Sequence, residues 1–144
     1  MISGHFGLNF VLSMPVIRAY VLLPGLTTDY VPIDFLLDTG STHTCVHPHD
    51  AKMRLQIDPS RLADPRQWPR LLSTTGIGGT AVGYAWPAVY QFVHDDGSVR
   101  QVRQQIEIAR PNATNATLPS LLGMDILRQF RVFVDYVGLQ VTLQ

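Results

Sequence analysis

The sequence predicts a single, mainly β domain with two short helices, in a pattern close to that of a small barrel, and three observations support this class. The chain has 144 residues, enough for one hydrophobic core without room for a second full domain, so residues 1–144 are treated as one unit. Hydrophobic residues make up 46% of it and charged residues 15%, as is typical of a globular protein. Ten of the 11 acidic residues are Asp, which favours turns and strand ends over helix interiors.

Alternating β-favouring residues, set between turn residues, predict the strands. These cover 6–12, 15–23, 31–37 and 44–47, then a glycine-rich hairpin over 76–86, a second hairpin over 88–109 that turns at Asp95-Asp96-Gly97, and two final strands within 132–143. Helices are predicted from Pro48 to residue 57 and over 124–130, because proline suits a first helical turn and apolar residues recur there at helical spacing. Residues 58–70 hold three prolines and are predicted to form a surface loop.

The charge and hydropathy of the chain argue against nucleic acid and membrane partners. Eleven basic and 11 acidic residues cancel, so no net field would attract a polyanion or an anionic bilayer. The apolar stretch Phe10–Leu26 is interrupted by Pro15, Arg18 and Pro24, and is therefore predicted to form two strands rather than a membrane span. The single cysteine, Cys45, excludes an intrachain disulfide. We expect a soluble, cytoplasmic protein.

Asp38 is the first candidate for chemistry because it directly follows the apolar residues 35–37 at the end of a predicted strand. A carboxylate in such a place must be stabilised by hydrogen bonds. The next residues, Thr39, Gly40 and Ser41, can supply them. Gly40 lets backbone N–H groups approach closely, and the Ser41 hydroxyl can donate a hydrogen bond to the carboxylate. This arrangement is typical of a positioned acid or base.

The order of three segments then resembles the retropepsin-like aspartic proteases over roughly residues 15–143. Asp38-Thr39-Gly40-Ser41 is similar to the catalytic signature of that family. The segment Leu121-Leu122-Gly123-Met124-Asp125-Ile126-Leu127 resembles its paired hydrophobic-hydrophobic-glycine element, and the glycine-rich segment Gly76–Gly83 lies between them, as the family's flap would. The resemblance implies the acid protease fold, with each half built as a closed β-barrel, and hydrolysis of peptide bonds.

In that family two Asp carboxylates hold a water molecule and share one proton, because two like charges so close together cannot both ionise. The ionised carboxylate takes a proton from the attacking water and the other donates one, without a metal, a cofactor or a covalent intermediate. The chain has no second Asp-Thr-Gly or Asp-Ser-Gly. The resemblance therefore implies a homodimer in which Asp38 of each subunit lies at the two-fold axis.

The resemblance also implies roles for the surrounding residues. Thr39 would hydrogen-bond to its mate across the axis, and Ser41 would support the outer oxygen of Asp38. The hydrophobic-glycine element Leu121, Leu122 and Gly123 would pack beside this loop. The flap residues would cover an extended peptide substrate, held as an added strand; they are Gly76, Ile77, Gly78, Gly79, Thr80 and Trp86.

Other positions depart from the viral members of the family. Thr42 and Met124 replace an Asp and an Arg that usually pair, which points to a cellular or bacterial branch and leaves open what stabilises each half. Asp125 is interpreted as a charge at a helix N-terminus rather than as a catalytic residue. The C-terminal hairpin Phe133–Leu143 is expected to form part of the dimer interface.

Two alternatives to a protease remain open. The first is a catalytically silent binding or regulatory domain on the same fold. The second is a metal-binding module, because His43, Cys45, His47 and His49 alternate along the chain and carry metal-ligating side chains. A straight strand would separate alternate residues by about 7 Å, too far for one ion to bind all four. Packing of Cys45 in the core, with exposed histidines, is the favoured interpretation.

Overall fold

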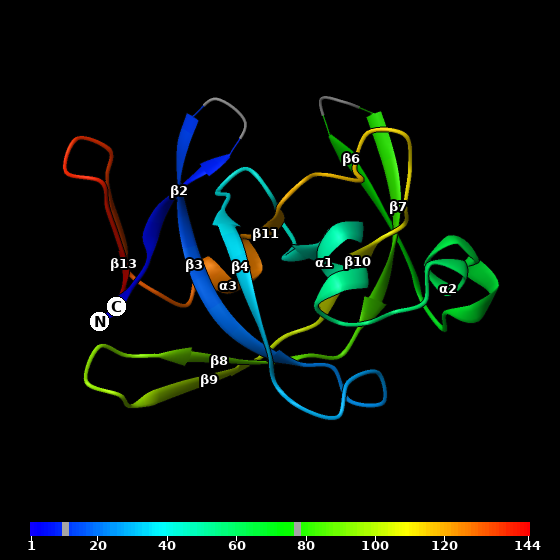
Figure 1. Cartoon of the computed structure of the whole chain (residues 1–144), viewed down its shortest axis with the longest axis horizontal. Helices are drawn as coiled ribbons and strands as arrows, with labels where there is room; N and C mark the ends of the chain where they lie inside the picture. The colour runs from blue at the N-terminus through cyan, green and yellow to red at the C-terminus, as the bar shows by residue number, and fades with distance from the viewer. Residues whose placement is uncertain (10–11, 77–78) are drawn as a thin grey trace.

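The computed structural model describes residues 1–9, 12–76 and 79–144, and it is mainly β as predicted (Figure 1). The strands are β1 (Ile2–Ser3), β2 (His5–Asn9), β3 (Leu12–Leu22), β4 (Val31–Leu37), β5 (Cys45–Val46), β6 (Leu71–Gly76), β7 (Gly79–Trp86), β8 (Val89–Val93), β9 (Val99–Arg103), β10 (Ile106–Ala109), β11 (Ser120–Leu122), β12 (Val132–Asp135) and β13 (Gln140–Leu143). The helices are α1 (Pro48–Met53), α2 (Pro59–Ala63), the 3-10 turn η1 (Pro65–Gln67) and α3 (Met124–Leu127).

A ten-stranded sheet carries most of the chain, in the order β6-β7-β10-β5-β11-β4-β3-β8-β9, with β2 also paired to β3. A second sheet has three strands, in the order β1-β13-β12. One edge of β3 pairs with β4, and its other edge is shared by β2, up to Val16, and β8, from Tyr20 onward. A single long strand thus connects two differently directed parts of the sheet.

The closed barrel expected from the family resemblance is not found in the described part of the chain. The strand order begins at β6 and ends at β9, and these two edges do not pair with each other. Figure 1 shows the reason, since the β6–β7 hairpin rises at one side while the β8–β9 hairpin runs across the opposite end. The sheet is therefore strongly bent but open.

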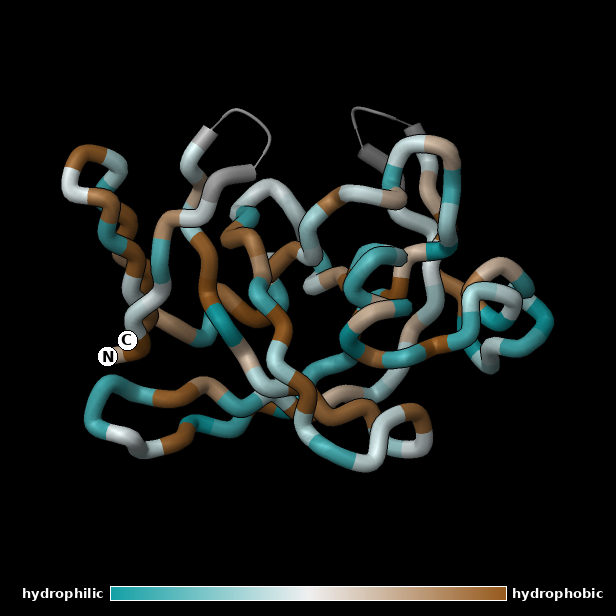
Figure 2. Tube along the Cα trace, viewed as in Figure 1, coloured by the Kyte–Doolittle hydropathy of each residue, from teal (hydrophilic) through white to brown (hydrophobic). Residues whose placement is uncertain are grey.

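The hydrophobic core lies against the centre of this sheet, where β3 and β4 alternate between buried and outward residues. Ile17 and Phe35 are fully buried. The next residue pair along the two strands, Arg18 and Asp34, points outward and forms an ion pair, with Arg18 Nε 2.7 Å from Asp34 Oδ1. Figure 2 shows these central strands as brown stretches interrupted by teal. Period-two alternation therefore places β4 as the sequence predicts, whereas β3 begins at Leu12, three residues before its predicted start at Pro15.

The helices confirm two predictions and correct a third. α1 and α3 lie within the two predicted helical segments, although both are shorter. The predicted surface loop 58–70 was wrong, because it contains α2 and η1. Each begins at an Asp-Pro pair: Asp58 accepts the N–H of Ser60 at 2.8 Å, and Asp64 accepts the N–H of Arg66 at 3.1 Å. Proline at the first helical position and a capping Asp before it together start a helix.

The second predicted hairpin is correct at its turn but not in its second arm. β8 and β9 pair on either side of the predicted turn, from Val93↔Val99 onward. The following apolar residues form a separate strand, β10, which pairs with β7 and β5 instead. The two arms separate at Gln104, whose N–H donates to Ala88 O at 3.1 Å. This break delivers β10 to the centre of the molecule.

An aromatic cluster fastens α2 and η1 to the sheet. Trp68 is only 5% exposed and stacks on Tyr84 of β7 with ring centroids 4.6 Å apart. Its indole N–H donates to Arg61 O at 2.8 Å, and the Tyr84 hydroxyl donates to Leu62 O. The stacked rings of Trp68 and Tyr84 therefore join the helical segment to the strand through both packing and hydrogen bonds.

Replacing Trp68 by Ala should destabilise the protein by about 3–5 kcal/mol, because it empties a large buried site. Trp68→Phe should cost less, since it keeps a ring against Tyr84 and loses only the indole N–H and some volume. Urea unfolding followed by far-UV circular dichroism measures both changes. A loss below about 1 kcal/mol for Trp68→Ala would show that the cluster does not hold this part of the fold.

Candidate active site

Asp38 lies at the end of β4, where a parallel neighbour holds it in place. β11 pairs with β4 through Leu121↔Leu36 and Leu122↔Leu37, and the ladder continues one step further as the Asp38 N–H donates to Leu122 O at 3.0 Å. The Gly40 N–H donates to Asp38 Oδ1 at 2.9 Å. Asp38 is half-buried, so part of the residue remains open to solvent.

Backbone hydrogen bonds tie the loop after Asp38 to the start of α3. The Met124 N–H donates to Ser41 O at 2.8 Å, and the Asp125 N–H donates to Thr42 O at 3.2 Å. The predicted hydrogen bond from the Ser41 hydroxyl to Asp38 is not formed in this chain. That hydroxyl donates instead to His43 O at 2.8 Å, because the loop turns this carbonyl toward it.

Asp125 stabilises the Asp38 loop through hydrogen bonds from Thr44. Its buried carboxylate accepts the Thr44 hydroxyl at 2.7 Å and the Thr44 N–H at 3.0 Å, and also the N–H of Ile126 at 2.9 Å. The Thr44 hydroxyl oxygen in turn accepts the Gly123 N–H at 3.0 Å. Asp125 lies in the first turn of α3, as predicted, but its contacts cross the structure to the Asp38 loop.

Gly123 permits this close approach of the two segments. A Cβ atom built at Gly123 would lie 2.5 Å from both the carbonyl carbon and the oxygen of His43. Real Cβ atoms do not come so near to backbone, so any side chain at this position would push the loop away from α3. The hydrophobic-hydrophobic-glycine element therefore packs beside the Asp38 loop, with Leu122 fully buried and Leu121 half-buried.

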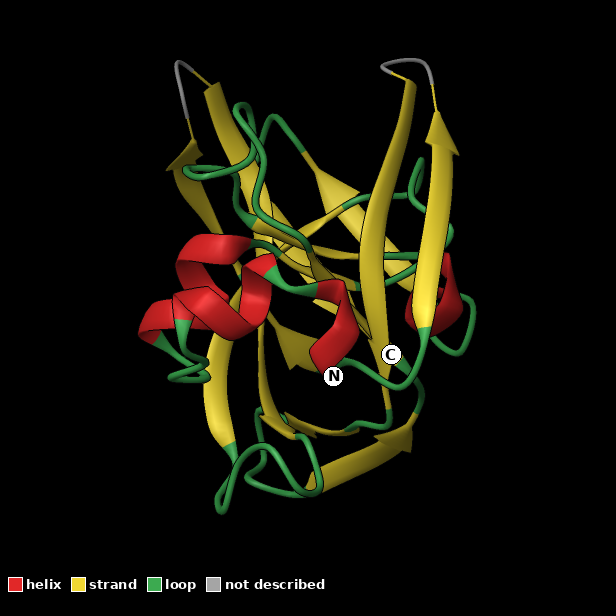
Figure 3. Cartoon of the chain, turned by 90° about the vertical axis from the view of Figure 1, so that its right-hand side faces the viewer, coloured by secondary structure: helices red, strands yellow, loops and turns green. Residues whose placement is uncertain are grey.

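The predicted flap is a hairpin formed by β6 and β7. Its strands pair along their length as far as Gly76↔Gly79, and Thr80 lies exposed one residue further. The predicted flap residues Ile77 and Gly78 lie outside the described residues. Figure 3 shows the arms of this hairpin and those of β2 and β3 rising at the same end of the molecule.

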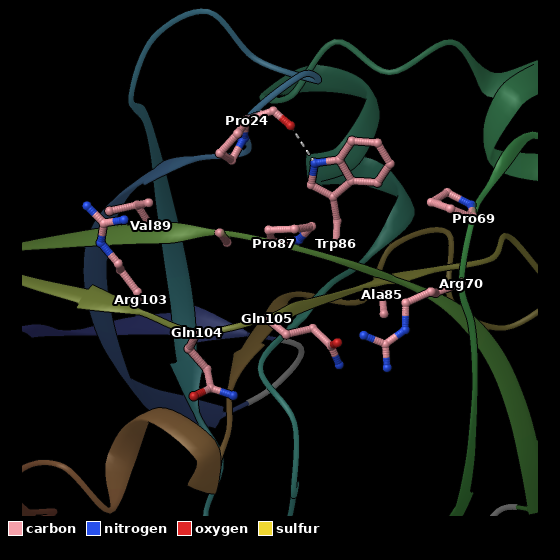
Figure 4. Close-up of a pocket in the computed structure, with 11 residues that line it drawn as sticks. Pro24, Pro69, Arg70, Ala85, Trp86, Pro87, Val89, Arg103, Gln104 and Gln105 are labelled. Carbon is pink, nitrogen blue, oxygen red and sulfur yellow. Dashed lines mark hydrogen bonds between the residues drawn. The ribbon is translucent and has the colours of Figure 1, made fainter.

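Trp86, also predicted to contact substrate, is not brought to the Asp38 loop. It lies at the opposite end of β7 from the hairpin tip, and its indole N–H donates to Pro24 O at 2.9 Å (Figure 4). Its ring lines a separate cavity of about 660 Å³, together with Pro69, Arg70 and Arg103. Its role in substrate binding stays a prediction without geometric support.

A second cavity, of about 360 Å³, lies directly beside the Asp38 loop. Ser41 of that loop and Leu121 of β11 line one side of it, and Thr80 and Val82 of the predicted flap line another. Glu107 of β10 also lines this cavity, and it was not predicted as a site residue. The only available signal was the single Glu of the chain within the apolar strand segment Ile106–Ala109.

Burial is the main cause of the shifted pKa values of Glu107 and Cys45 in this cavity. Burial raises the pKa of Glu107 above its ordinary value, the more so because Asp125 is nearby, while His43 and a hydrogen bond from Thr74 act in the opposite direction. Burial also raises the pKa of the Cys45 thiol, and Glu107 adds to this. The thiol is therefore held in its neutral form, and Glu107 is the acidic group of the cavity.

The four alternating His and Cys residues do not gather into one ligand set. Cys45 is buried in β5, and the Nδ1 of His47 is hydrogen-bonded to the carbonyl of Pro119. Burial also lowers the pKa of His47, which favours its neutral form. Across residues 1–9, 12–76 and 79–144, no group of three or more His, Cys, Asp or Glu side chains is placed to hold a metal ion.

Comparison with known proteins adds no family assignment. No protein-family model matches the chain, and no curated protein matches it either. Among the residues that the structure describes, no helix has both the length and the apolar character needed to cross a membrane. The functional interpretation therefore depends on the geometry of the Asp38 loop.

Gly123→Ala should destabilise the protein by about 1–3 kcal/mol or more, because the added methyl group overlaps the backbone of His43. Gly7→Ala is the matched control, since a Cβ there has its nearest contact at an ordinary 3.6 Å. Thermal and urea unfolding of both variants measure the difference. Equal stability of the two variants would contradict the close packing of the loop against α3.

The raised pKa of Glu107 predicts how stability depends on pH. The neutral form suits the folded chain, so the stability that Glu107 contributes is fully present below its ordinary pKa of 4.5 and is lost as pH rises through the raised value. Glu107→Gln should therefore be more stable than wild type at pH 7, and this advantage should vanish at pH about 4.

Urea unfolding at several pH values between about 4 and 8 measures this advantage. Asp96→Asn serves as the control, because hydrogen bonds from Ser98 lower the pKa of Asp96 and its substitution should give no gain at pH 7. A Glu107→Gln effect that is the same at every pH would contradict the assignment.

Proposed function

We propose that the chain is a retropepsin-like aspartic endopeptidase that acts as a homodimer, each subunit contributing one Asp38. The observation that carries this proposal is the placement of Asp38. Its carboxylate ends a core strand, accepts the Gly40 N–H, and stays half-exposed in a loop that is tied to residues 122–125. A preformed loop that presents an accessible carboxylate is what water activation requires.

The site in one chain supplies a single carboxylate of the required kind. Asp125, the acid of α3 that contacts the loop, is buried and accepts hydrogen bonds from the Thr44 N–H and hydroxyl, so its role is structural. Thr39 is exposed, and no hydrogen bond to its hydroxyl is present within the described chain. In the proposed dimer Thr39 bonds across the two-fold axis, and the second Asp38 completes the dyad.

The C-terminal hairpin supports the proposed dimer as a surface for the second copy. Its strands β12 and β13 form a three-stranded sheet with β1, in which β12 is an edge strand. Phe133 and Val137 are exposed, Val137 by 97%, and Figure 2 shows the apolar tip of this hairpin projecting from the molecule. An exposed apolar edge strand favours association with another chain.

In this mechanism the substrate is an extended peptide that lies beneath the β6–β7 hairpin. One Asp38 takes a proton from a water molecule as its oxygen attacks the peptide carbonyl carbon, and the other donates a proton to the carbonyl oxygen. Collapse of the resulting tetrahedral species breaks the C–N bond, with a proton passing to the leaving amine. The reaction proceeds by acid–base catalysis on the two carboxylates.

Asp38→Asn should reduce cleavage of an unstructured protein by about 10²–10⁴-fold or more at pH of about 4–6, because it removes the general base. Cleavage is followed by mass spectrometry of the products, with size-exclusion chromatography to show that the variant still dimerises. Asp96→Asn, a surface substitution in the β8–β9 turn, is the control and should leave cleavage unchanged. Retained activity in Asp38→Asn would overturn the proposal.

Mixing the two proteins tests the shared dyad. If each site needs Asp38 from both subunits, activity after subunit exchange should fall with the square of the wild-type fraction. A linear fall would mean that each chain carries a complete site. Absence of cleavage by a wild-type dimer across acidic pH would instead favour the silent binding domain.

A further inference from the structure

We propose that Glu107 makes the cavity beside the Asp38 loop a subsite for a Lys or Arg side chain of the bound polypeptide, an assignment that rests on the proposed peptidase function. The cavity measures about 360 Å³, enough for one long side chain. Glu107 lies in its wall, is only 7% exposed and accepts a hydrogen bond from Thr74, but it forms no ion pair within the described chain. A cation supplied by the substrate neutralises it.

The strand register places Glu107 and Asp38 on the same face of the sheet. Residues paired directly across neighbouring strands project to the same side. Glu107 pairs with Ala85, and Ala81 lies four residues earlier on β7 and so faces the same way. The residues that share this face, from β6 across to β4, are Thr74, Ala81, Ala85, Glu107, Cys45, Leu121 and Leu36. Asp38 follows Leu36 by two residues while its N–H continues the β4–β11 ladder, so it belongs to this face too. A peptide crossing the face would meet both carboxylates.

Gly83 of β7 makes room for the Glu107 side chain. A Cβ at Gly83 would lie 2.6 Å from Glu107 Oε1 and 2.9 Å from its Cγ. Because β7 has no side chain at this point, the carboxylate can lie across the strand and reach the Thr74 hydroxyl, which donates to Oε1 at 3.3 Å. The backbone is thus shaped around the position of this acid.

The charge of the cavity is not balanced by the protein. None of the described residues that line it is Lys or Arg, and Glu107 forms no ion pair within the described chain, although His43 lies near enough to act on it electrostatically. His47 also lines the cavity, but its Nδ1 is occupied by Pro119 O. A buried carboxylate without a cation gains more from an incoming positive charge than an exposed one does, since water no longer screens the attraction.

The remaining walls suit the stem of a basic side chain. Leu118 and Leu121 are apolar, and both line the cavity beside Glu107. Lys and Arg bury their methylene groups along apolar surface and keep the charged end on a polar partner. A neutral aliphatic side chain would fill the same volume but would leave the carboxylate buried without a cation. The cavity therefore discriminates by charge.

The test separates binding from catalysis. Catalytically silenced Asp38→Asn protein is incubated at pH 7 with a pool of random unstructured peptides, and the retained peptides are sequenced by mass spectrometry. Lys and Arg should be enriched at one fixed position. Replacing Lys by norleucine at that position in a synthetic peptide should weaken its binding about 10- to 100-fold, the effect expected for a charge-assisted hydrogen bond.

Glu107→Gln in the same background should abolish the difference between the Lys and norleucine peptides, whereas Asp96→Asn should preserve it. Glu107→Lys should reverse the preference toward acidic peptides, and its circular dichroism shows whether it folds. Equal binding of both peptides by the Glu107-containing protein, or a preference that survives Glu107→Gln, would overturn the subsite. A retained Lys preference together with no cleavage by wild type would overturn the proposed peptidase function instead.

Discussion

The buried carboxylate of Asp125 accepts the N–H and the hydroxyl of Thr44, and the shape of the Asp38 loop depends on this contact. The two residues are 81 positions apart in the chain, so the contact joins two segments that are distant in sequence. Hydrogen bonds to a charged acceptor contribute about 1.5–3 kcal/mol each, and a buried carboxylate that lost them would be strongly unfavourable. The loop and the helix therefore stabilise each other.

This contact fixes the shape of the Asp38 loop within one chain. The Gly123 N–H donates to the Thr44 hydroxyl, and the backbone bonds from Met124 and the residue after it reach the loop at Ser41 and Thr42. All of them lie within one chain. The Asp38 carboxylate is thus positioned by its own subunit, and association of two chains would have only to bring two finished halves together.

The sequence was informative wherever a local rule decides the structure. Period-two alternation located β3 and β4, and the signature after β4 located the Asp38 loop. It failed where two local signals compete: the prolines of residues 58–70 favoured a loop, but the Asp before Pro59 and Pro65 made each a helix start. The sequence also did not predict the strand break at Gln104, because the break is caused by the pairing of β10 with distant strands.

The site residues divide along the same line. The hydroxyl of Ser41 has one proton, and whether Asp38 or His43 receives it depends on the turn of the loop, which sequence does not specify. Glu107 was not predicted as a site residue, for a stronger reason. It lies between apolar residues of β10 and becomes part of a cavity only because β7 and β5 carry Gly83 and Cys45 beside it.

Glu107 also shows how an unfavourable interaction can support a proposed function. Its raised pKa means that the folded chain disfavours its charge, so near neutral pH this carboxylate lowers stability. A residue of similar size without the charge would fill the same space at no such cost, and Gly83 shows that the neighbouring strand is shaped to admit the acid. A destabilising group in a fitted cavity, on the face that also carries Asp38, is best explained by a ligand that neutralises it.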